Sequence, residues 1–208
     1  MGSAAHKVCV FAVPGILLVL TPAPSHAELT RVEITRRVDV LNGKAFGDVG
    51  PYEKLHGKAY FAVDPKNPRN QGIADIDLAP RNREGKVEFS ADLFILKPKD
   101  PSRGNGVVFF DVVNRGRFRL LSTFSAAAAA DDPTTEAHFG DASLLLQGFT
   151  LVAVGWQFDV EGDLIGLDAP IPTDNGRPIR GWLRESFIPD QPRDSYNWTG
   201  GNTTHGYL

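Results

Sequence analysis

The sequence predicts an α/β fold in which a β-rich first half, residues 28–105, leads into a parallel β-α-β unit, residues 106–156. Apolar and polar residues alternate along segments of the first half, which is typical of half-buried strands. The second part holds two nearly continuous apolar runs, VVFFDVV at 107–113 and FTLVAVGW at 149–156. Such runs are typical of strands buried on both faces. The connection between them is far longer than a hairpin loop, so it allows parallel pairing.

The first 27 residues carry the pattern of a secretory signal peptide. Lys7 gives a positive start, and residues 8–20 form the apolar run VCVFAVPGILLVL. Small residues, Ser25 and Ala27, precede Glu28 at the −3 and −1 positions of a cleavage site. A membrane anchor is the alternative, but the run is shorter than the roughly 20 apolar residues that a spanning helix needs. We therefore expect export to the periplasm or the extracellular medium, and no membrane association after cleavage.

Composition and charge limit how residues 28–208 can be stabilised and which partners they can bind. The single cysteine, Cys9, lies in the signal segment, so the mature chain has no disulfide and must be held by a hydrophobic core. Loss of Lys7 with the signal changes the net charge from −3 to −4. A mildly acidic chain with scattered basic residues carries no electrostatic footprint for nucleic acid and no polybasic membrane patch.

The first half, residues 28–105, is expected to hold mostly antiparallel strands joined by short loops. Segments with alternating or apolar character predict three strands, with a fourth in the stretch between the last two. In chain order these are 32–40, 58–63, 73–78 and 87–95. Residues 44–57 are polar and glycine-rich and are expected to form a loop.

Helices are expected between the two apolar runs. Residues 118–130 include five consecutive alanines at 126–130, and residues 141–147 (DASLLLQ) end before Gly148. Beyond residue 156 the signals weaken, so residues 157–208 are expected to be largely irregular, with one possible strand at 179–188.

Three stretches of this sequence resemble a known family. They are GPYEKLHGKAYFAVDP at 50–65, NQGIADIDLAPRNREGKVEFSADLFILKP at 70–98 and VVFFDVVNRG at 107–116. Together they resemble the front half of exported bacterial α/β-hydrolase domain-containing proteins, and the resemblance covers about residues 30–208. It implies that residues 28–208 are the N-terminal portion of an α/β-hydrolase domain.

The resemblance also implies an activity. Proteins of this fold cleave ester-like bonds of small molecules with a serine nucleophile, an acid and a histidine, in that chain order. All three would follow the apolar run at 149–156, and we expect them beyond Leu208. Residues 1–208 would then be a fragment that is inactive alone. No cofactor is implied, and neither the substrate nor the oligomeric state follows from the sequence.

No serine of residues 28–208 lies in a nucleophile elbow. A nucleophile elbow needs glycine two residues before and after the serine, and no serine has both. Ser102 has Gly104 on one side only and precedes a strand, so a turn serine is the simpler interpretation. The histidines of the mature chain, His56, His138 and His205, are expected to be surface or hydrogen-bonded residues.

One element of a catalytic site is expected within the chain. In α/β-hydrolases the oxyanion hole uses a backbone N–H from the loop after the third strand, and here the candidates are Asn114, Arg115 and Gly116. Loss of one such donor costs about 3 kcal/mol of transition-state stabilisation. The alternative is a plain turn with its arginines in solvent.

Metal and nucleotide sites have little support. Asp159, Glu161 and Asp163 alternate as calcium ligands do, but Pro170 stands where an EF-hand has its glutamate, so a solvated acidic turn is the simpler interpretation. The chain has no CxxC, HExxH, GxGxxG or P-loop motif. Three tryptophans could line a sugar site: Trp156, Trp182 and Trp198. Of these, Trp156 lies at the end of a predicted strand and is expected in the core.

A second class of function stays open. The chain could be a non-catalytic extracellular β-rich module that binds glycans or proteins. The alternating strands of the first half fit such a module equally well, whereas the two apolar runs with a helical crossover fit it badly.

Overall fold

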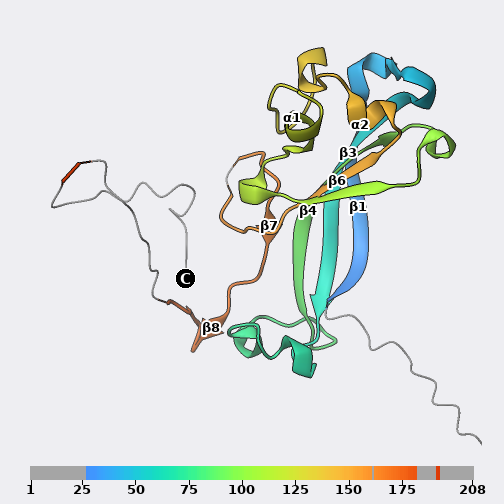
Figure 1. Cartoon of the computed structure of the whole chain (residues 1–208). Helices are drawn as coiled ribbons and strands as arrows, with labels where there is room; N and C mark the ends of the chain where they lie inside the picture. The colour runs from blue at the N-terminus through green and yellow to red at the C-terminus, as the bar shows by residue number, and fades with distance from the viewer. Residues whose placement is uncertain (1–26, 161, 182–190, 193–208) are drawn as a thin grey trace, which may run out of the picture.

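The computed structural model describes residues 27–160, 162–181 and 191–192. Its main feature is a seven-stranded sheet (Figure 1) whose principal path runs β1-β3-β4-β6-β5. These strands are β1 (Glu28–Asp39), β3 (Gly50–Val63), β4 (Val87–Pro98), β6 (Thr150–Val154) and β5 (Val108–Val112). Two short strands join it at the sides: β2 (Ala45–Phe46) pairs with β3, and β7 (Leu167–Asp168) pairs with β4. A separate hairpin is formed by β8 (Thr173–Asp174) and β9 (Arg177–Pro178).

The sheet is mixed but mostly antiparallel. β1 with β3, β3 with β4, and β4 with β6 are all antiparallel pairs. β5 is the exception, because it runs parallel to β6 with Phe110 opposite Val152. β5 and β1 therefore form the two edges of the main path.

The predicted α/β fold, as the front portion of an α/β-hydrolase sheet with a parallel β-α-β unit, is wrong for this structure. The described chain is β-rich, and its only α-helices are α1 (Leu120–Phe124) and α2 (Ser143–Leu146), of five and four residues. Short 3₁₀ turns make up the remaining helical segments. They lie at Val40–Gly43, Gly47–Val49, Pro68–Asn70, Ile76–Leu78, Pro101–Arg103, Asn114–Gly116 and Glu136–His138.

Tertiary hydrogen bonds explain why the alanine run is not helical. α1 ends at Phe124, and Ala126 adopts a left-handed φ of 47°. The following backbone bonds to a distant segment instead of to itself: Asp141 N–H donates to Ser125 O, and Ala128 N–H donates to Ala137 O. A short alanine run is only marginally helical by itself, so these bonds decide its conformation.

Two further predictions about elements were wrong. Residues 50–57, expected in a loop, belong to β3, where residues 52–57 pair with β4 and residues 50–51 pair with β2. Residues 73–78, expected as a strand, form turns that include Ile76–Leu78. The possible strand at 179–188 lies mostly outside the described residues.

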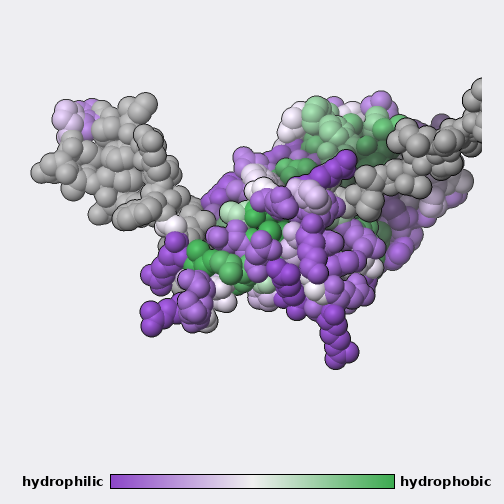
Figure 2. All heavy atoms as spheres, turned by 90° about the horizontal axis from the view of Figure 1, so that it is seen from below, coloured by the Kyte–Doolittle hydropathy of each residue, from purple (hydrophilic) through white to green (hydrophobic). Residues whose placement is uncertain are grey.

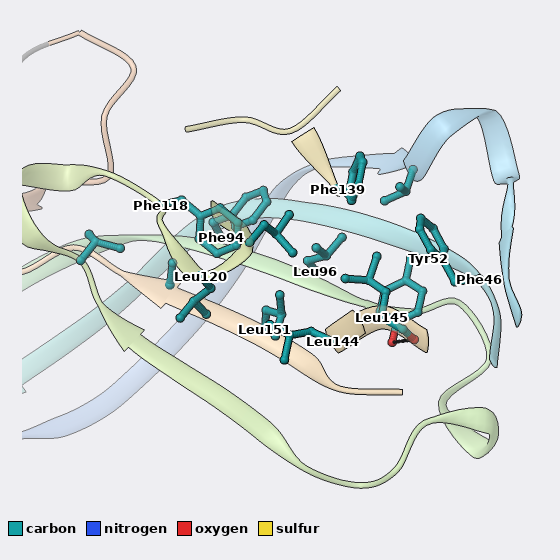
Figure 3. Close-up of a cluster of buried hydrophobic side chains, with 14 of the residues drawn as sticks. Phe46, Tyr52, Phe94, Leu96, Phe118, Leu120, Phe139, Leu144, Leu145 and Leu151 are labelled. Atoms are coloured by element: carbon teal, nitrogen blue, oxygen red, sulfur yellow. Dashed lines mark hydrogen bonds between the residues drawn. The ribbon is translucent and has the colours of Figure 1, made fainter. Parts of the chain in front are cut away.

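One face of the sheet, here called the front face, carries the main core (Figure 3). Phe94, Leu96 and Leu151 point from it into a cluster with Phe118 and Leu145 of the crossover. Figure 1 shows α1 and α2 near the same end of the sheet. The front face therefore carries the larger core, and a second, smaller cluster of Val63, Ile76 and Val87 lies on the opposite face.

The hydroxyl of Tyr52 ties the crossover to the sheet. It lies 3.0 Å from Leu145 O and 3.0 Å from Phe149 O, and the Tyr52 side chain is fully buried. Its ring packs edge-on against Phe46. Burial raises the pKa of Tyr52 above its ordinary value, so the hydroxyl stays a donor.

The opposite side of the sheet, here called the back face, is also apolar. Strand register places Leu55, Ile95, Val152 and Phe110 in one row across four strands. Within the described residues, no helix is long and apolar enough to cross a membrane.

Candidate functional site

The predicted oxyanion turn, Asn114–Gly116, directly follows β5. Arg115 and Gly116 both have left-handed φ values, 52° and 71°. The Arg115 backbone N–H donates to Oε1 of Gln157 over 2.5 Å, and the N–H of Arg117 donates to Asn114 O over 3.2 Å. An oxyanion at the Arg115 N–H would therefore have to replace the Gln157 carbonyl.

The same turn is tied to the segment around residues 157–165. The Arg115 guanidinium lies 2.9 Å from Oδ2 of Asp159, and Ile165 N–H donates to Gly116 O over 3.0 Å. A Cβ at Gly116 would lie 2.8 Å from Cβ of Leu164, so only glycine fits this contact at this φ. The turn therefore packs against residues 157–165, and the Arg115 side chain forms an ion pair rather than extending into solvent.

The other sequence candidates are dispersed. Ser102 lies in the Pro101–Arg103 turn, where its hydroxyl donates to Asp100 Oδ1 over 2.7 Å. Nδ1 of His138 accepts from the backbone N–H of Thr134 over 3.0 Å. His205 lies outside the described residues. The structure therefore brings no described serine and histidine of this set together.

The acidic turn and the tryptophans give a similar result. Asp159 is paired with Arg115, and no group of three His, Cys, Asp or Glu side chains in the described part of the chain could hold a metal ion. Trp156 was expected in the core but is 53% exposed, and its indole N–H donates to Val113 O over 2.7 Å. Glu161, Trp182 and Trp198 lie outside the described residues.

A charged cluster on the front face was missed at the sequence level. His56 of β3 accepts at Nε2 from the guanidinium of Arg36 on β1, over 2.8 Å. Arg36 also pairs with Asp132 at 3.1 Å, and Asp132 bonds to the buried ammonium of Lys54. Lys54 donates in addition to Pro133 O over 2.7 Å. The cluster ties the turn at 131–133 to strands β1 and β3.

Burial and neighbouring charges set the protonation of this cluster. Burial lowers the pKa of His56, and the Arg36 cation lowers it further. Burial of Asp132 opposes its ionisation, but the hydrogen bond and charge of Lys54 outweigh it, so the pKa of Asp132 lies below its ordinary range. At neutral pH the cluster therefore holds a neutral imidazole beside an ionised carboxylate.

A hollow of about 690 Å³ adjoins the cluster. Its lining includes Arg36, His56, Asp92 and Asp132 together with residues 162–165. The one hydroxyl side chain among these described lining residues is Thr35, which donates to the backbone O of His56 over 3.2 Å. Among these described lining residues there is no serine or cysteine beside the imidazole. Alternation of polar residues within 50–58 was the signal that could have revealed a strand carrying Lys54 and His56 on one face.

The exposed edge strand is the most distinctive surface. Val108, Phe110 and Val112 of β5 point to the back face and are 56%, 56% and 55% exposed. The outer edge of β5 pairs with no other strand of the described chain. In Figure 2 hydrophobic surface is gathered into green patches within a largely purple surface. An apolar strand with a free edge is a ready template for pairing with another chain.

No protein-family model, no curated protein and no solved structure matches this chain.

Proposed function

We propose that this protein is a polypeptide-binding module whose binding surface is the outer edge of β5 with the exposed side chains of Val108, Phe110 and Val112. One observation carries the proposal: these three apolar side chains are each more than half exposed on a strand with one free edge. An extended segment of a partner would add to β5 as a further strand, which gives backbone hydrogen bonds and pockets for alternate side chains.

A comparison of the two sheet edges supports this choice. β1, the other edge, carries two register shifts, between Leu29 and Arg31 and between Ile34 and Arg36. It is also rich in charged side chains along its length. Bulges and charges are the devices by which proteins protect an edge from pairing. β5 has a continuous register with β6, and its one charged residue, Asp111, alternates with the exposed apolar residues.

The position of β5 also indicates the amino-acid composition of the partner strand. β5 already pairs in parallel with β6, and parallel strands are normally buried on both faces. The partner strand is therefore expected to be rich in β-branched and aromatic residues. On its back side, these would pack against Phe110 and its two neighbours.

The proposal is tested by site-specific photo-crosslinking in the host. Phe110 is replaced by p-benzoylphenylalanine, and the matched control carries the same residue in place of Leu146, which is 49% exposed on α2. We expect a discrete adduct from position 110 and none from position 146. Hydrogen exchange of the purified adduct should show slowed β5 amides. Equal adducts from both positions, or unprotected β5 amides, would contradict the proposal.

Ester hydrolysis is the second candidate function. It is favoured by the turn Asn114–Gly116, because a strand docked along β5 would end beside the backbone N–H groups of this turn. Such groups can stabilise an oxyanion. The partner would have to supply the nucleophile.

This second candidate has its own test. Purified residues 28–208, and the complex isolated by crosslinking, are assayed with p-nitrophenyl butyrate and labelled with a fluorophosphonate. We expect activity and label only in the complex, with the label on the partner. Label on Ser102 or on another serine of residues 28–208 would contradict this assignment.

A further inference from the structure

We infer that the back face of the sheet binds an amphipathic α-helix with an acidic end. This helix belongs to the partner that pairs with β5. This inference rests on the proposed function and adds the chemistry of the partner. It is carried by a different observation, which is the exposure of large apolar side chains on the back face of β1 as well as of β5; Leu55 and Leu93, which lie between these strands, are buried.

Strand register defines the surface. Exposed large hydrophobic side chains of both edge strands lie on the back face, and half-buried ones of β4 and β6 lie between them. The exposed ones are Leu29, Val32, Ile34, Val108, Phe110 and Val112; the half-buried ones are Ile95, Val152 and Val154. Trp156 adjoins this surface at the end of β5, where its indole is held by Val113 O. On the front face, by contrast, α1, α2 and the crossover cover the end of the sheet that carries Leu96 and Leu151.

One end of the back face has a surplus of positive charge. The Glu53 carboxylate is 4% exposed, and it accepts from Arg37 at 2.7 Å and from Lys97 at 2.9 Å. Two cations thus share one buried carboxylate. Lys99 and Asp39 pair at 2.8 Å in the same region and cancel each other. An occupant with acidic residues at this end would complement the surplus.

The dimensions suit one helix. The row of Arg37, Leu55, Ile95, Val152 and Phe110 crosses the sheet from β1 to β5. Its four strand spacings of about 4.8 Å give a length of roughly 19 Å, the length of a helix of about 13 residues. Such a helix would place one apolar stripe over Ile95, Val152 and Phe110 with its acidic end near Arg37.

A defined peptide tests the chemistry directly. The probe is a fluorescein-labelled 14-residue helix with leucine at i, i+3, i+4 and i+7 and three glutamates at one end. A second peptide carries three lysines in place of the glutamates. Binding to the purified exported protein is measured by fluorescence anisotropy. We expect the glutamate peptide to bind at least about fivefold more tightly than the lysine peptide.

Variants locate the site. Val112→Lys should weaken the glutamate peptide at least about tenfold. The matched control Leu146→Lys replaces a leucine that is 49% exposed on α2 and should leave binding unchanged. Arg37→Gln keeps the Glu53–Lys97 pair but removes the surplus charge, so it should abolish the preference for glutamate. Circular dichroism checks that each variant is folded.

The outcomes separate the two proposals. Equal losses in the Val112 and Leu146 variants, no preference between peptides, or a dimer that buries the back face against a second copy would overturn this inference. An adduct at position 110 with slowed exchange of the β5 amides, but without helix binding, would leave the proposed function standing and the helix refuted. Helix binding without any strand adduct would refute the proposed function itself.

Discussion

Arg36 on β1 donates a guanidinium N–H to Nε2 of His56 on β3 over 2.8 Å, so the imidazole must act there as an acceptor. Arginine has no acceptor and keeps its charge, and a protonated imidazole would lose this bond and place two cations together. The pair therefore favours neutral His56, in addition to the effect of burial.

This arrangement predicts acid sensitivity. The pKa of His56 is lowered in the folded protein by burial and then by Arg36. Below the unfolded pKa of about 6.5 the unfolded chain binds the proton more readily, so the free energy of unfolding should fall as pH falls from 7. Urea unfolding between pH 7.5 and 5 measures this slope. His56→Gln should flatten it, and Arg36→Gln should reduce it only in part, because burial remains. An unchanged slope in His56→Gln would contradict the assignment.

The Lys54–Asp132 pair predicts a large loss on removal of its acid. The Lys54 side chain is 4% exposed. In Asp132→Ala the buried ammonium of Lys54 would keep Pro133 O as its remaining acceptor in this cluster. We expect a loss of about 3 kcal/mol in the free energy of unfolding. Lys54→Met with Asp132→Asn should be less harmful than Asp132→Ala alone. Glu136→Ala breaks the exposed Lys44–Glu136 pair and should cost less than about 1 kcal/mol.

Substitutions of Phe110 on β5 and of Leu151 on the adjacent β6 should differ strongly in their effect on the free energy of unfolding. Phe110 is 56% exposed and Leu151 is fully buried. Phe110→Ser should change the free energy of unfolding by less than about 1 kcal/mol and lower the binding of anilinonaphthalene sulfonate. Leu151→Ala should cost about 2–5 kcal/mol. If Phe110→Ser destabilises the protein as strongly as Leu151→Ala, β5 is not an open surface.

The Tyr52 hydroxyl predicts a measurable link between β3 and the crossover. Tyr52→Phe removes the donor at Leu145 O and Phe149 O without creating a large cavity. We expect a loss of about 1–2 kcal/mol in thermal unfolding experiments. Tyr60→Phe removes an exposed bond to Glu33 and serves as the control, with a change below about 0.5 kcal/mol. If Tyr52→Phe and Tyr60→Phe lose equal stability, the buried hydrogen bonds of Tyr52 do not stabilise the fold.

Export also remains a prediction with a direct measurement. Intact mass and N-terminal sequencing of the protein from its host should find Glu28 as the first residue. In the structure β1 begins at this same residue. A protein that still carries residues 1–27 after export would contradict cleavage by a signal peptidase.

Strands were largely predictable from the sequence, and helices only in part, because α1 and α2 lie within the predicted segments 118–130 and 141–147 but are shorter. Segments 32–40, 87–95, 107–113 and 149–156 contain or overlap β1, β4, β5 and β6, because alternation and apolar runs reflect side-chain burial directly. The alanine-rich stretch failed because its backbone bonds to residues 137–141, which local propensity does not describe. The first part of β3 was taken for a loop because its polar residues are buried in ion pairs rather than exposed.

The sequence by itself determined most of the strand segments and their apolar faces, because these follow from local spacing. It also places the only cysteine, Cys9, within the predicted signal segment. Only the tertiary structure decided that the fold is a mostly antiparallel mixed sheet and that β5 is an open edge. It also brought Arg36, His56 and Asp132 together, and it joined the Asn114–Gly116 turn to Gln157 and Asp159. These are contacts between residues far apart in the chain, and they depend on strand order and register, which local patterns leave undetermined.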